Sequence, residues 1–449
     1  MSPFLLLTSL IISITVVVFL ISKLKFNAAL ALVLGSLLMG TLARMDLLQV
    51  VNGINSGFGG MMAGIGFPIG FGIILGQLLS DAGGANVIAD KIVKIFPESK
   101  AVYAIAFAGF VLSIPVFFDV TFVVLIPVAI ATMKKVNKSI PYMIGAISIG
   151  AGIAHSMIPP TPNPLAAAEI FGFDLGIILF VGLIIGMLAL FITLFIYIKI
   201  LDRGLWNKEK DENNLGIAIQ EQEKLNKYPS FFEALIPIIL PIATILLNTI
   251  YSVIFPEGNS VFLKFIGTKS ISMLLGTLAA YIIAVKYIGS KRAADSATKS
   301  LEAAGIVFLI TGAGGSFAEI IKLSGVNDAI VGLITGLGGN VILVIVLSRI
   351  LGVIFRQITG SGTVAGITSM TMMASVASSV TIHPVFISLA CLSGGMFGAT
   401  INDSGFWIVS NMSGFNFSGG VKTYTLGEAL ASVVCLIIIV VYALIASIF

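Results

Sequence analysis

Charged residues are scarce in this sequence. Asp, Glu, Lys and Arg together make up 10% of its 449 residues, whereas a soluble globular protein has roughly 25%. This scarcity excludes a soluble enzyme, a disordered chain and a nucleic-acid-binding protein. Only two cysteines occur, Cys391 and Cys435, and both lie in apolar stretches, so no disulfide framework is expected. The motifs His-Glu-x-x-His and Gly-x-Ser-x-Gly are absent, so the residues indicate neither an intramembrane hydrolase nor a cofactor or metal.

Apolar residues are abundant instead, at 57% of the chain. Because a bilayer crossing takes about 20 mostly apolar residues, the chain can supply on the order of ten spans. The 48 glycines are typical of membrane helices that pack closely. We therefore predict an all-α polytopic membrane protein with about 10–12 transmembrane helices. The apolar runs fall at 4–22, 27–43, 57–79, 101–133, 140–170, 172–200, 231–254, 270–289, 305–323, 326–355, 364–377, 384–415 and 424–449.

One strongly polar stretch, 201–229, separates residues 1–200 from 230–449 and is expected to be a cytoplasmic linker between two halves. The remaining basic clusters lie at 23–25, 91–100, 134–138 and 286–299. The positive-inside rule puts all of them on the cytoplasmic side if the N-terminus is outside and 101–133 is a re-entrant hairpin broken near Pro115. The predicted location is the inner (plasma) membrane.

The second half of the chain resembles the first at an offset of about 242 residues. Residues 81–89 align with 323–331, and the segment around Pro115 aligns with 357–363. The first repeat, about 57–200, begins outside and the second, about 305–449, begins inside, so the copies are predicted to be inverted. Inverted repeats with broken helices are typical of secondary transporters, whose substrate binds where the breaks meet.

The first two predicted breaks lie in the first half of the chain. Asp119 follows Pro115, and an intramembrane carboxylate is costly unless it faces a cavity, so Asp119 is the leading proton or cation site. The structural alternative is an Asp that caps the second half-helix. Four prolines in 159–164 interrupt the next helix and expose Thr161 and Asn163. His155, one turn earlier, suits proton coupling, with a packing role as its alternative.

The other two predicted breaks lie in the second half of the chain. Arg356 precedes a hydroxyl-rich and glycine-rich segment with Ser361 and Thr363, and its guanidinium suits bidentate carboxylate binding. The structural alternative for Arg356 is an ion pair with Asp119 or Asp403. At 398–407 the donors for substrate hydroxyls are Thr400, Asn402 and Ser404. Asp403 is a second intramembrane carboxylate, with a helix cap as its alternative.

At these four breaks the sequence resembles the gluconate permease family. This family comprises the gluconate:proton symporters and their relatives for D-serine, idonate and fructuronate. The resemblance spans nearly the whole chain in order. It rests on Pro115-Val-Phe-Phe-Asp-Val120 with Leu125-Ile-Pro127, His155 before Pro159-Pro160, Arg356 with Gly360-Ser-Gly-Thr-Val-Ala365, Asn402-Asp-Ser-Gly-Phe-Trp407, and the glycine-rich stretch 57–84.

The resemblance implies a symporter of the wider ion-transporter superfamily that moves a small organic anion with protons by an elevator-like motion. Relatives of this type make a homodimer the expected assembly. Family members commonly have Pro-Pro-His-Pro-Gly-Pro where this chain has Pro159-Pro-Thr-Pro-Asn-Pro164, and often His where Ile401 stands. Glycerate is therefore an equal candidate with gluconate.

The main hypothesis is proton-coupled symport of a sugar acid or hydroxy acid. The expected substrate-binding residues are Arg356, Ser361, Thr363, Thr161, Asn163, Asn402 and Asp403, and the proton-coupling residues are Asp119 and His155. Sodium coupling, through carbonyls and hydroxyls at the same breaks, is one alternative. A passive organic-anion channel is another, and it would show a continuous polar lining in place of four isolated breaks.

Overall fold

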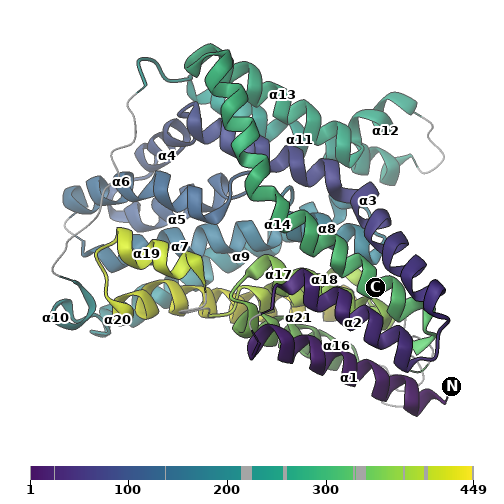
Figure 1. Cartoon of the computed structure of the whole chain (residues 1–449). Helices are drawn as coiled ribbons and strands as arrows, with labels where there is room; N and C mark the ends of the chain where they lie inside the picture. The colour runs from purple at the N-terminus through teal and green to yellow at the C-terminus, as the bar shows by residue number, and fades with distance from the viewer. Residues whose placement is uncertain are drawn as a thin grey trace.

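The structure is a computed structural model. It describes residues 2–24, 26–136, 138–213, 225–255, 260–326, 329, 340–377, 380–398 and 403–446, and the regular elements within these ranges are helices (Figure 1). Among the described residues, 9 helices are long and apolar enough to cross a membrane, or 10 if the bent pair α4 and α5 counts as one span. Two shorter apolar helices, α2 and α18, add to these. The predicted all-helical polytopic membrane protein is confirmed.

Residues before the polar linker form α1 (Pro3–Ser22), α2 (Ala28–Leu42), α3 (Leu47–Asp81), α4 (Gly84–Ile95), η1 (Glu98–Lys100), α5 (Ala101–Leu112), α6 (Phe118–Val136), α7 (Ile140–Met157), α8 (Pro162–Phe171) and α9 (Leu175–Asp202). Residues after Asp202 form α10 (Lys208–Asp211), α11 (Phe231–Ile254), α12 (Val261–Gly267), α13 (Lys269–Ile288), α14 (Ser290–Leu323), α16 (Val341–Thr359), α17 (Gly362–Ala377), α18 (Pro384–Gly395), α19 (Ser404–Met412), α20 (Phe417–Gly420), the π-helical turn η2 (Val421–Thr425) and α21 (Leu426–Ala446).

Four interruptions in these helices lie where the sequence predicts breaks. Residues 113–117 separate α5 from α6, and 158–161 separate α7 from α8. Residues 360–361 separate α16 from α17, and the fourth interruption lies between α18 and α19. Single prolines inside α3 and α6, Pro68 and Pro127, do not end their helices. The inverted relation between the two halves remains a prediction.

Two helices are longer than the apolar runs predict. The runs begin at residues 57 and 305, but α3 begins at Leu47 and α14 at Ser290. Polar residues before each run continue the helix, and the side chain of Asp46 caps α3 by accepting a hydrogen bond from the amide of Gln49. The apolar runs leave the basic cluster at 286–299 between two spans, where a loop would be expected, but nearly all of it is helical in α13 and α14.

α3 and α14 come from different halves of the chain and pack against each other. A Cβ atom added to Gly57 would lie 2.4 Å from the carbonyl oxygen of Gly315, and one added to Gly315 would lie 2.5 Å from that of Gly57. The two backbones are therefore in direct contact, as small residues permit in membrane helices. Ser316 strengthens the contact by donating a hydrogen bond of 2.8 Å to the carbonyl of Ile54.

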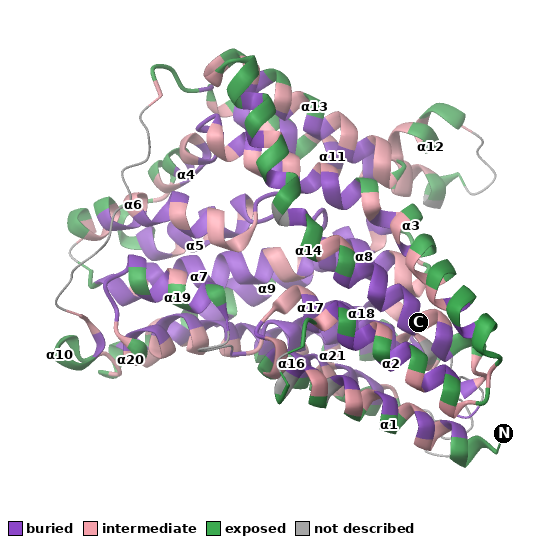
Figure 2. Cartoon of the chain, in the orientation of Figure 1, coloured by how far each residue is buried: buried purple, intermediate pink, exposed green. Residues whose placement is uncertain are grey.

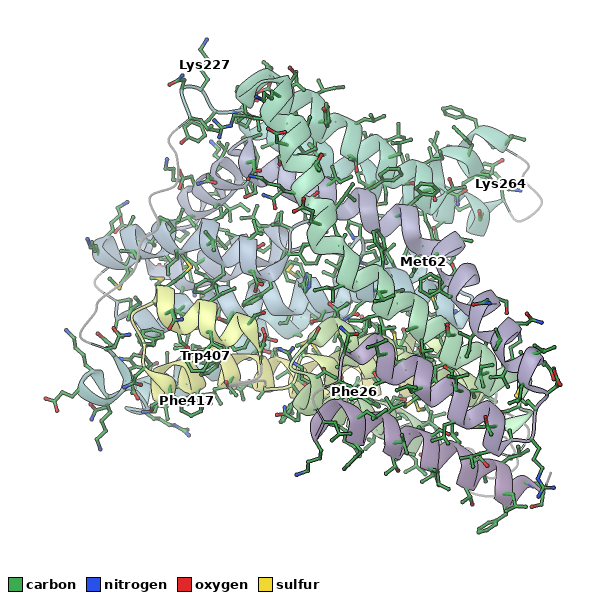
Figure 3. The ribbon with its side chains drawn as sticks, in the orientation of Figure 1. Phe26, Met62, Lys227, Lys264, Trp407 and Phe417 are labelled. Atoms are coloured by element: carbon green, nitrogen blue, oxygen red, sulfur yellow. The ribbon has the colours of Figure 1, made fainter. Side chains whose placement is uncertain are left out.

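The broken helices lie in the middle of the protein. Figure 2 shows buried residues concentrated along α5, α7, α8 and α18, whereas α1, α3 and α12 carry exposed residues along their outer sides. Some large apolar side chains are exposed, among them those of Phe26 and Phe417, which are labelled in Figure 3 and have 42% and 51% of their surfaces exposed. Outward apolar side chains suit a lipid environment, which leaves the central breaks to line a cavity.

Candidate functional site

A cavity of about 350 Å³ lies where three of the breaks and the start of α21 meet. We call it the central cavity. Its wall comes from the turn between α5 and α6, the end of α7, the turn between α16 and α17, the segment from α18 to α19, and the segment from η2 to α21. Its lining residues are Phe117, Phe118, Asp119, Gly152, His155, Ser156, Arg356, Thr359, Gly360, Ser361, Gly362, Thr363, Gly395, Met396, Asp403, Ser404, Gly405, Tyr424 and Glu428.

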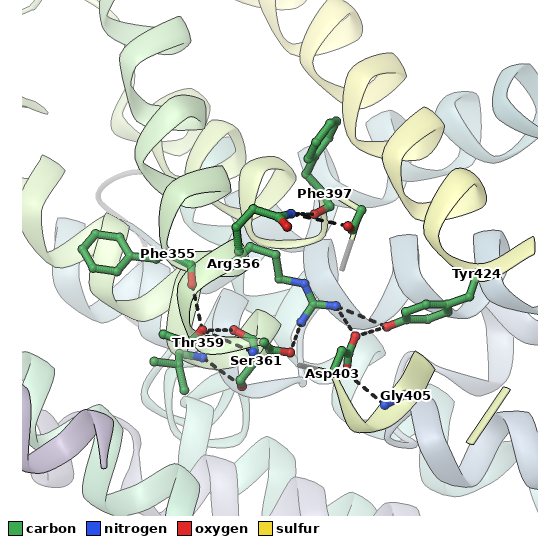
Figure 4. A network of polar contacts seen from close by, with 12 residues as sticks. Phe355, Arg356, Thr359, Ser361, Phe397, Asp403, Gly405 and Tyr424 are labelled. Carbon is green, nitrogen blue, oxygen red and sulfur yellow. Dashed lines mark hydrogen bonds and ion pairs between the residues drawn. The ribbon is translucent and has the colours of Figure 1, made fainter. Parts of the chain in front are cut away.

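Arg356 lies in the last turn of α16 and is 5% exposed. Its Nη2 donates to Oδ2 of Asp403 over 2.6 Å and to the hydroxyl of Tyr424 over 3.2 Å (Figure 4). Its Nη1 donates to the carbonyl of Gly360 over 2.7 Å, which Gly360 presents from a left-handed conformation with φ of 72°. Nε has no hydrogen-bond partner among the described residues. The guanidinium therefore uses three of its five N–H groups.

Asp403 accepts hydrogen bonds from three groups. Its Oδ2 accepts from Arg356 and from the hydroxyl of Tyr424, and its Oδ1 accepts from the amide of Gly405 over 2.9 Å. The contact with Gly405 caps α19, since Asp403 is its N-cap residue. The ion pair and the helix cap, offered above as structural alternatives, are both present. Together they fasten the turn between α16 and α17 to the start of α19.

Asp119 is the second residue of α6, where a carboxylate interacts favourably with the helix dipole. Within the part of the chain that the structure describes, its carboxylate makes no hydrogen bond or ion pair. It borders the central cavity and also a second cavity of about 400 Å³, whose wall includes Asn86, Tyr228 and Arg292. We call the second one the linker-side cavity. Asp119 is thus a free intramembrane acid shared by two cavities.

His155 lies in the last turn of α7, on the wall of the central cavity. The ring of Phe117 packs against it with ring centroids 5.4 Å apart. Its Nδ1 is buried and has no hydrogen-bond partner among the described residues. Packing against Phe117 explains the ring position but leaves this nitrogen unused.

The polar residues of the second break, Thr161 and Asn163, are not among the residues that line the central cavity. Thr161 donates its hydroxyl hydrogen bond to the carbonyl of Ile158 over 2.8 Å, so the hydroxyl is used locally. Asn163 donates from Nδ2 to the carbonyl of Gly362 over 3.1 Å and joins the second break to the third. Its Oδ1 is buried without a partner among the described residues.

Ser361 and Thr363 both line the central cavity, as their position after Arg356 predicts. The Oγ of Ser361 accepts a hydrogen bond of 3.3 Å from the amide of Val364, which leaves its hydroxyl hydrogen available. Ser404 from the fourth break also borders the cavity. Thr400 and Asn402, named above as donors, lie outside the described residues.

Sequence reasoning missed two residues of this cavity, Tyr424 and Glu428. Both belong to the last apolar run, whose single acid resembles an ordinary residue at the membrane surface. The signal that could have found them is the combination of an acid and a tyrosine one turn apart inside a span with no compensating base. The partners of Tyr424 are Arg356 at the end of α16 and Asp403 at the N-cap of α19, which only the tertiary structure brings together.

The sequence has relatives among known transporters. A family model described as GntP family permease matches residues 5–445. An uncharacterized permease of Haemophilus influenzae is 30% identical over 91% of this chain and 86% of that protein. A gluconate permease of Pseudomonas aeruginosa is 29% identical over 98% of both chains. The Gnt-II system L-idonate transporter of Escherichia coli is 25% identical over 92% of this chain and 93% of its own length.

Two solved structures share the fold. MtrF of Neisseria gonorrhoeae, described as illuminating a class of antimetabolite efflux pumps, superposes with a TM-score of 0.65 over 89% of this chain and 84% of its own, at 13% identity. The Alcanivorax borkumensis transporter YdaH, described as having an unusual topology, gives a TM-score of 0.58 over 88% and 89%, also at 13% identity. The sequence match across nearly the whole chain, on a transporter fold with broken helices around a polar cavity, shows that the chain belongs to the GntP family of permeases.

Proposed function

We propose that this permease carries a small sugar acid or hydroxy acid, such as gluconate or glycerate, together with protons. The proposal rests on two residues that line the same cavity. Arg356 provides a permanent positive charge, and Asp119 provides a carboxylate that makes no hydrogen bond or ion pair among the described residues. Relatives named for gluconate and L-idonate favour the same substrate class. A volume of about 350 Å³ suits a small ligand.

Arg356 is the proposed anchor for the substrate carboxylate. Its Nε is unused, whereas its two terminal nitrogens already donate to Asp403, Tyr424 and Gly360. An incoming carboxylate can therefore use an N–H group that is not yet bonded, such as that of Nε, or compete with Asp403 for Nη2. Competition would release Asp403 from Arg356. The ion pair between these two residues is the contact that fastens the third break to the fourth.

Hydroxyl groups of the substrate would meet the turn between α16 and α17. Ser361 and Thr363 border the cavity there and can both donate and accept hydrogen bonds. Thr161, Asn163 and Asn402 remain proposed contributors from the neighbouring breaks. Asn163 already donates a hydrogen bond to the carbonyl of Gly362. A shift of this turn would therefore also displace Asn163 in the second break or break this hydrogen bond.

Asp119 and His155 are the proposed proton-coupling residues. A carboxylate that reaches two cavities can exchange protons with both, and the unused Nδ1 of His155 can accept one. The remaining proposals are residence in the inner membrane with the N-terminus outside, a homodimer surrounded by lipid, and an elevator-like displacement of the broken helices.

Uptake into proteoliposomes tests the function. With radiolabelled gluconate or glycerate and an acid exterior, we expect accumulation above the outside concentration and its collapse on adding a protonophore. A sodium gradient at equal pH tests the sodium alternative. Uptake that only reaches the outside concentration under either gradient would indicate a passive channel and overturn the coupling.

A further inference from the structure

Glu428 is a buried acid with no hydrogen bond or ion pair to any residue that the structure describes. It lies in the first turn of α21 and is 3% exposed, and its Oε1 makes no hydrogen bond within the described part of the chain. A buried charged carboxylate costs several kcal/mol unless it is paired. Glu428 nevertheless borders the central cavity, so it is placed where a ligand or a proton can reach it.

The backbone of α7 makes room for this carboxylate. A Cβ atom added to Gly152 would lie 1.8 Å from Oε1 of Glu428 and 2.6 Å from its carboxyl carbon. The acid therefore occupies the space that a side chain at position 152 would take. The carboxylate is held against α7 at the cavity wall and does not extend into lipid.

The charged and titratable groups near Glu428 do not neutralise it. On α21 and the elements packed against it, and at the N-cap of α19, they are Arg349 and Arg356 from α16, Tyr142 and His155 from α7, Tyr197 from α9, Cys391 from α18, Lys422 and Tyr424 from η2, Cys435 and Tyr442 on α21, and Asp403. Lys422 is paired with Asp211. Arg356 is already paired with Asp403, and Arg349 donates to Ser432 and stacks on the ring of Phe397. α18 contains no Asp, Glu, His, Lys or Arg, and those of α9 lie in its last turn.

Binding of an anion would change this balance. One arginine and one aspartate already compensate each other at the cavity, so an added substrate carboxylate brings a surplus negative charge into a medium of low dielectric. A neighbouring carboxylate then gains affinity for a proton, and by linkage the proton raises the affinity for the anion. Among the described residues that line the cavity, Asp119 and Glu428 are the carboxylates without a hydrogen-bond partner.

We propose that Glu428 is a second proton-binding residue of the central cavity, which takes up a proton from the aqueous side when the substrate anion binds beside Arg356. The inference rests on the proposed function above. It implies that substrate binding takes up protons at two positions, Asp119 and Glu428, and that neither acid alone accounts for the coupling.

Proton uptake on substrate binding tests this directly. Purified protein in weakly buffered detergent solution with a pH-indicator dye is titrated with gluconate, then with glycerate, and protons bound per substrate bound are counted. We expect the Glu428→Gln protein to take up about one proton fewer per substrate than the wild type. The glutamine cannot bind the proton whose binding is linked to that of the substrate. Glu428→Asp keeps a carboxylate and should restore the uptake. Glu302→Gln, an exposed acid on α14, is the matched control.

A second variant keeps the test independent of how well Glu428→Gln folds. Asp119→Asn protein retains Glu428 and should still take up a proton with the substrate. Asp119→Asn protein that binds substrate without proton uptake, or Glu428→Gln protein that matches the wild type, would overturn the role of Glu428 alone. Wild-type protein that binds these acids with no proton uptake would instead overturn the coupled function itself.

Discussion

Arg356 and Asp403 form an ion pair of 2.6 Å between the end of one helix and the cap of another. Their side chains are 6% and 9% exposed, so neither charge has ready access to water. Removing one partner of such a pair leaves the other charge buried, which costs more than the pair contributes. The pair is therefore both a structural fastening and the place where a substrate anion would compete.

Replacing Asp403 tests the fastening. Asp403→Asn leaves the Arg356 charge without its partner, and we expect the free energy of unfolding to fall by about 3–5 kcal/mol. Thermal unfolding in detergent measures the loss. The double variant Arg356→Gln/Asp403→Asn is expected to be more stable than Asp403→Asn, because no buried charge remains. Equal losses in the two proteins would contradict a dependence on the charge pair.

Asp119→Asn should lower accumulation while it preserves exchange. The asparagine keeps the size of the side chain but cannot bind or release a proton, so proteoliposomes should concentrate labelled substrate less than the wild type at the same pH gradient. Counterflow with internal unlabelled substrate checks that the binding site is intact. Asp90→Asn, at an exposed acid on α4, is the control. Normal accumulation by the Asp119→Asn protein would rule out Asp119 as the proton site.

Gly152→Ala should move Glu428 without unfolding the protein. The new Cβ meets a side-chain oxygen at 1.8 Å, and a side chain can rotate away where a backbone could not. We expect the dissociation constant for the substrate to rise about tenfold, equivalent to about 1.4 kcal/mol, as measured by calorimetry in detergent. Gly305→Ala on α14, where no atom lies within 4 Å, should leave it unchanged. A similar change in both variants would contradict the effect on Glu428.

The stability of the folded protein depends on pH through the carboxylate of Asp211. Burial alone would raise the pKa of Asp211, but hydrogen bonds from Lys422, Ser418 and the amide of Asn207 hold the pKa below its usual value. A pKa that is lower in the folded chain contributes stability above the unfolded value of about 3.9, and that stability is lost as pH falls through the folded pKa.

The variant Asp211→Asn should therefore lose about 1–3 kcal/mol at neutral pH, as expected for hydrogen bonds to a charged group. Its deficit relative to the wild type should shrink as the pH drops below about 4, where the wild-type carboxylate is protonated as well. Melting temperatures across this range measure both effects. A deficit that is constant with pH would show that the charge of Asp211 is not its source.

Local chemistry in the sequence was enough to place the breaks. The proline cluster at 159–164 removes backbone donors that a helix needs, and Gly360 ends α16 in a left-handed conformation that glycine adopts readily. The ends of α3 and α14 were not predictable in this way, because hydropathy marks where lipid begins and not where hydrogen bonding along a helix stops. Asp46 caps α3 eleven residues before the apolar run that begins at residue 57, and a capping side chain acts outside the membrane just as well.

The partners within the cavity were only partly predictable. Asp403 was one of two acids that could pair with Arg356, and the sequence had no means to choose between it and Asp119. That choice depends on how α16 and α19 meet. Glu428 escaped notice for the same reason, because its relation to Gly152 is a contact between α21 and α7 that no spacing along the chain encodes.

The contact between Gly57 and Gly315 restricts how this protein can evolve. Every amino-acid change at either codon adds at least one carbon atom, and that atom would meet a backbone oxygen at 2.4 or 2.5 Å. Backbone atoms cannot rotate aside as a side chain can, so the clash is removed only if α3 and α14 move apart. A larger residue on one helix cannot be offset by a smaller one on the other, since glycine is already the smallest. A substitution in either half of the chain therefore has no single compensating mutation at the opposite position, and drift at this contact must begin with a change in the distance between two helices.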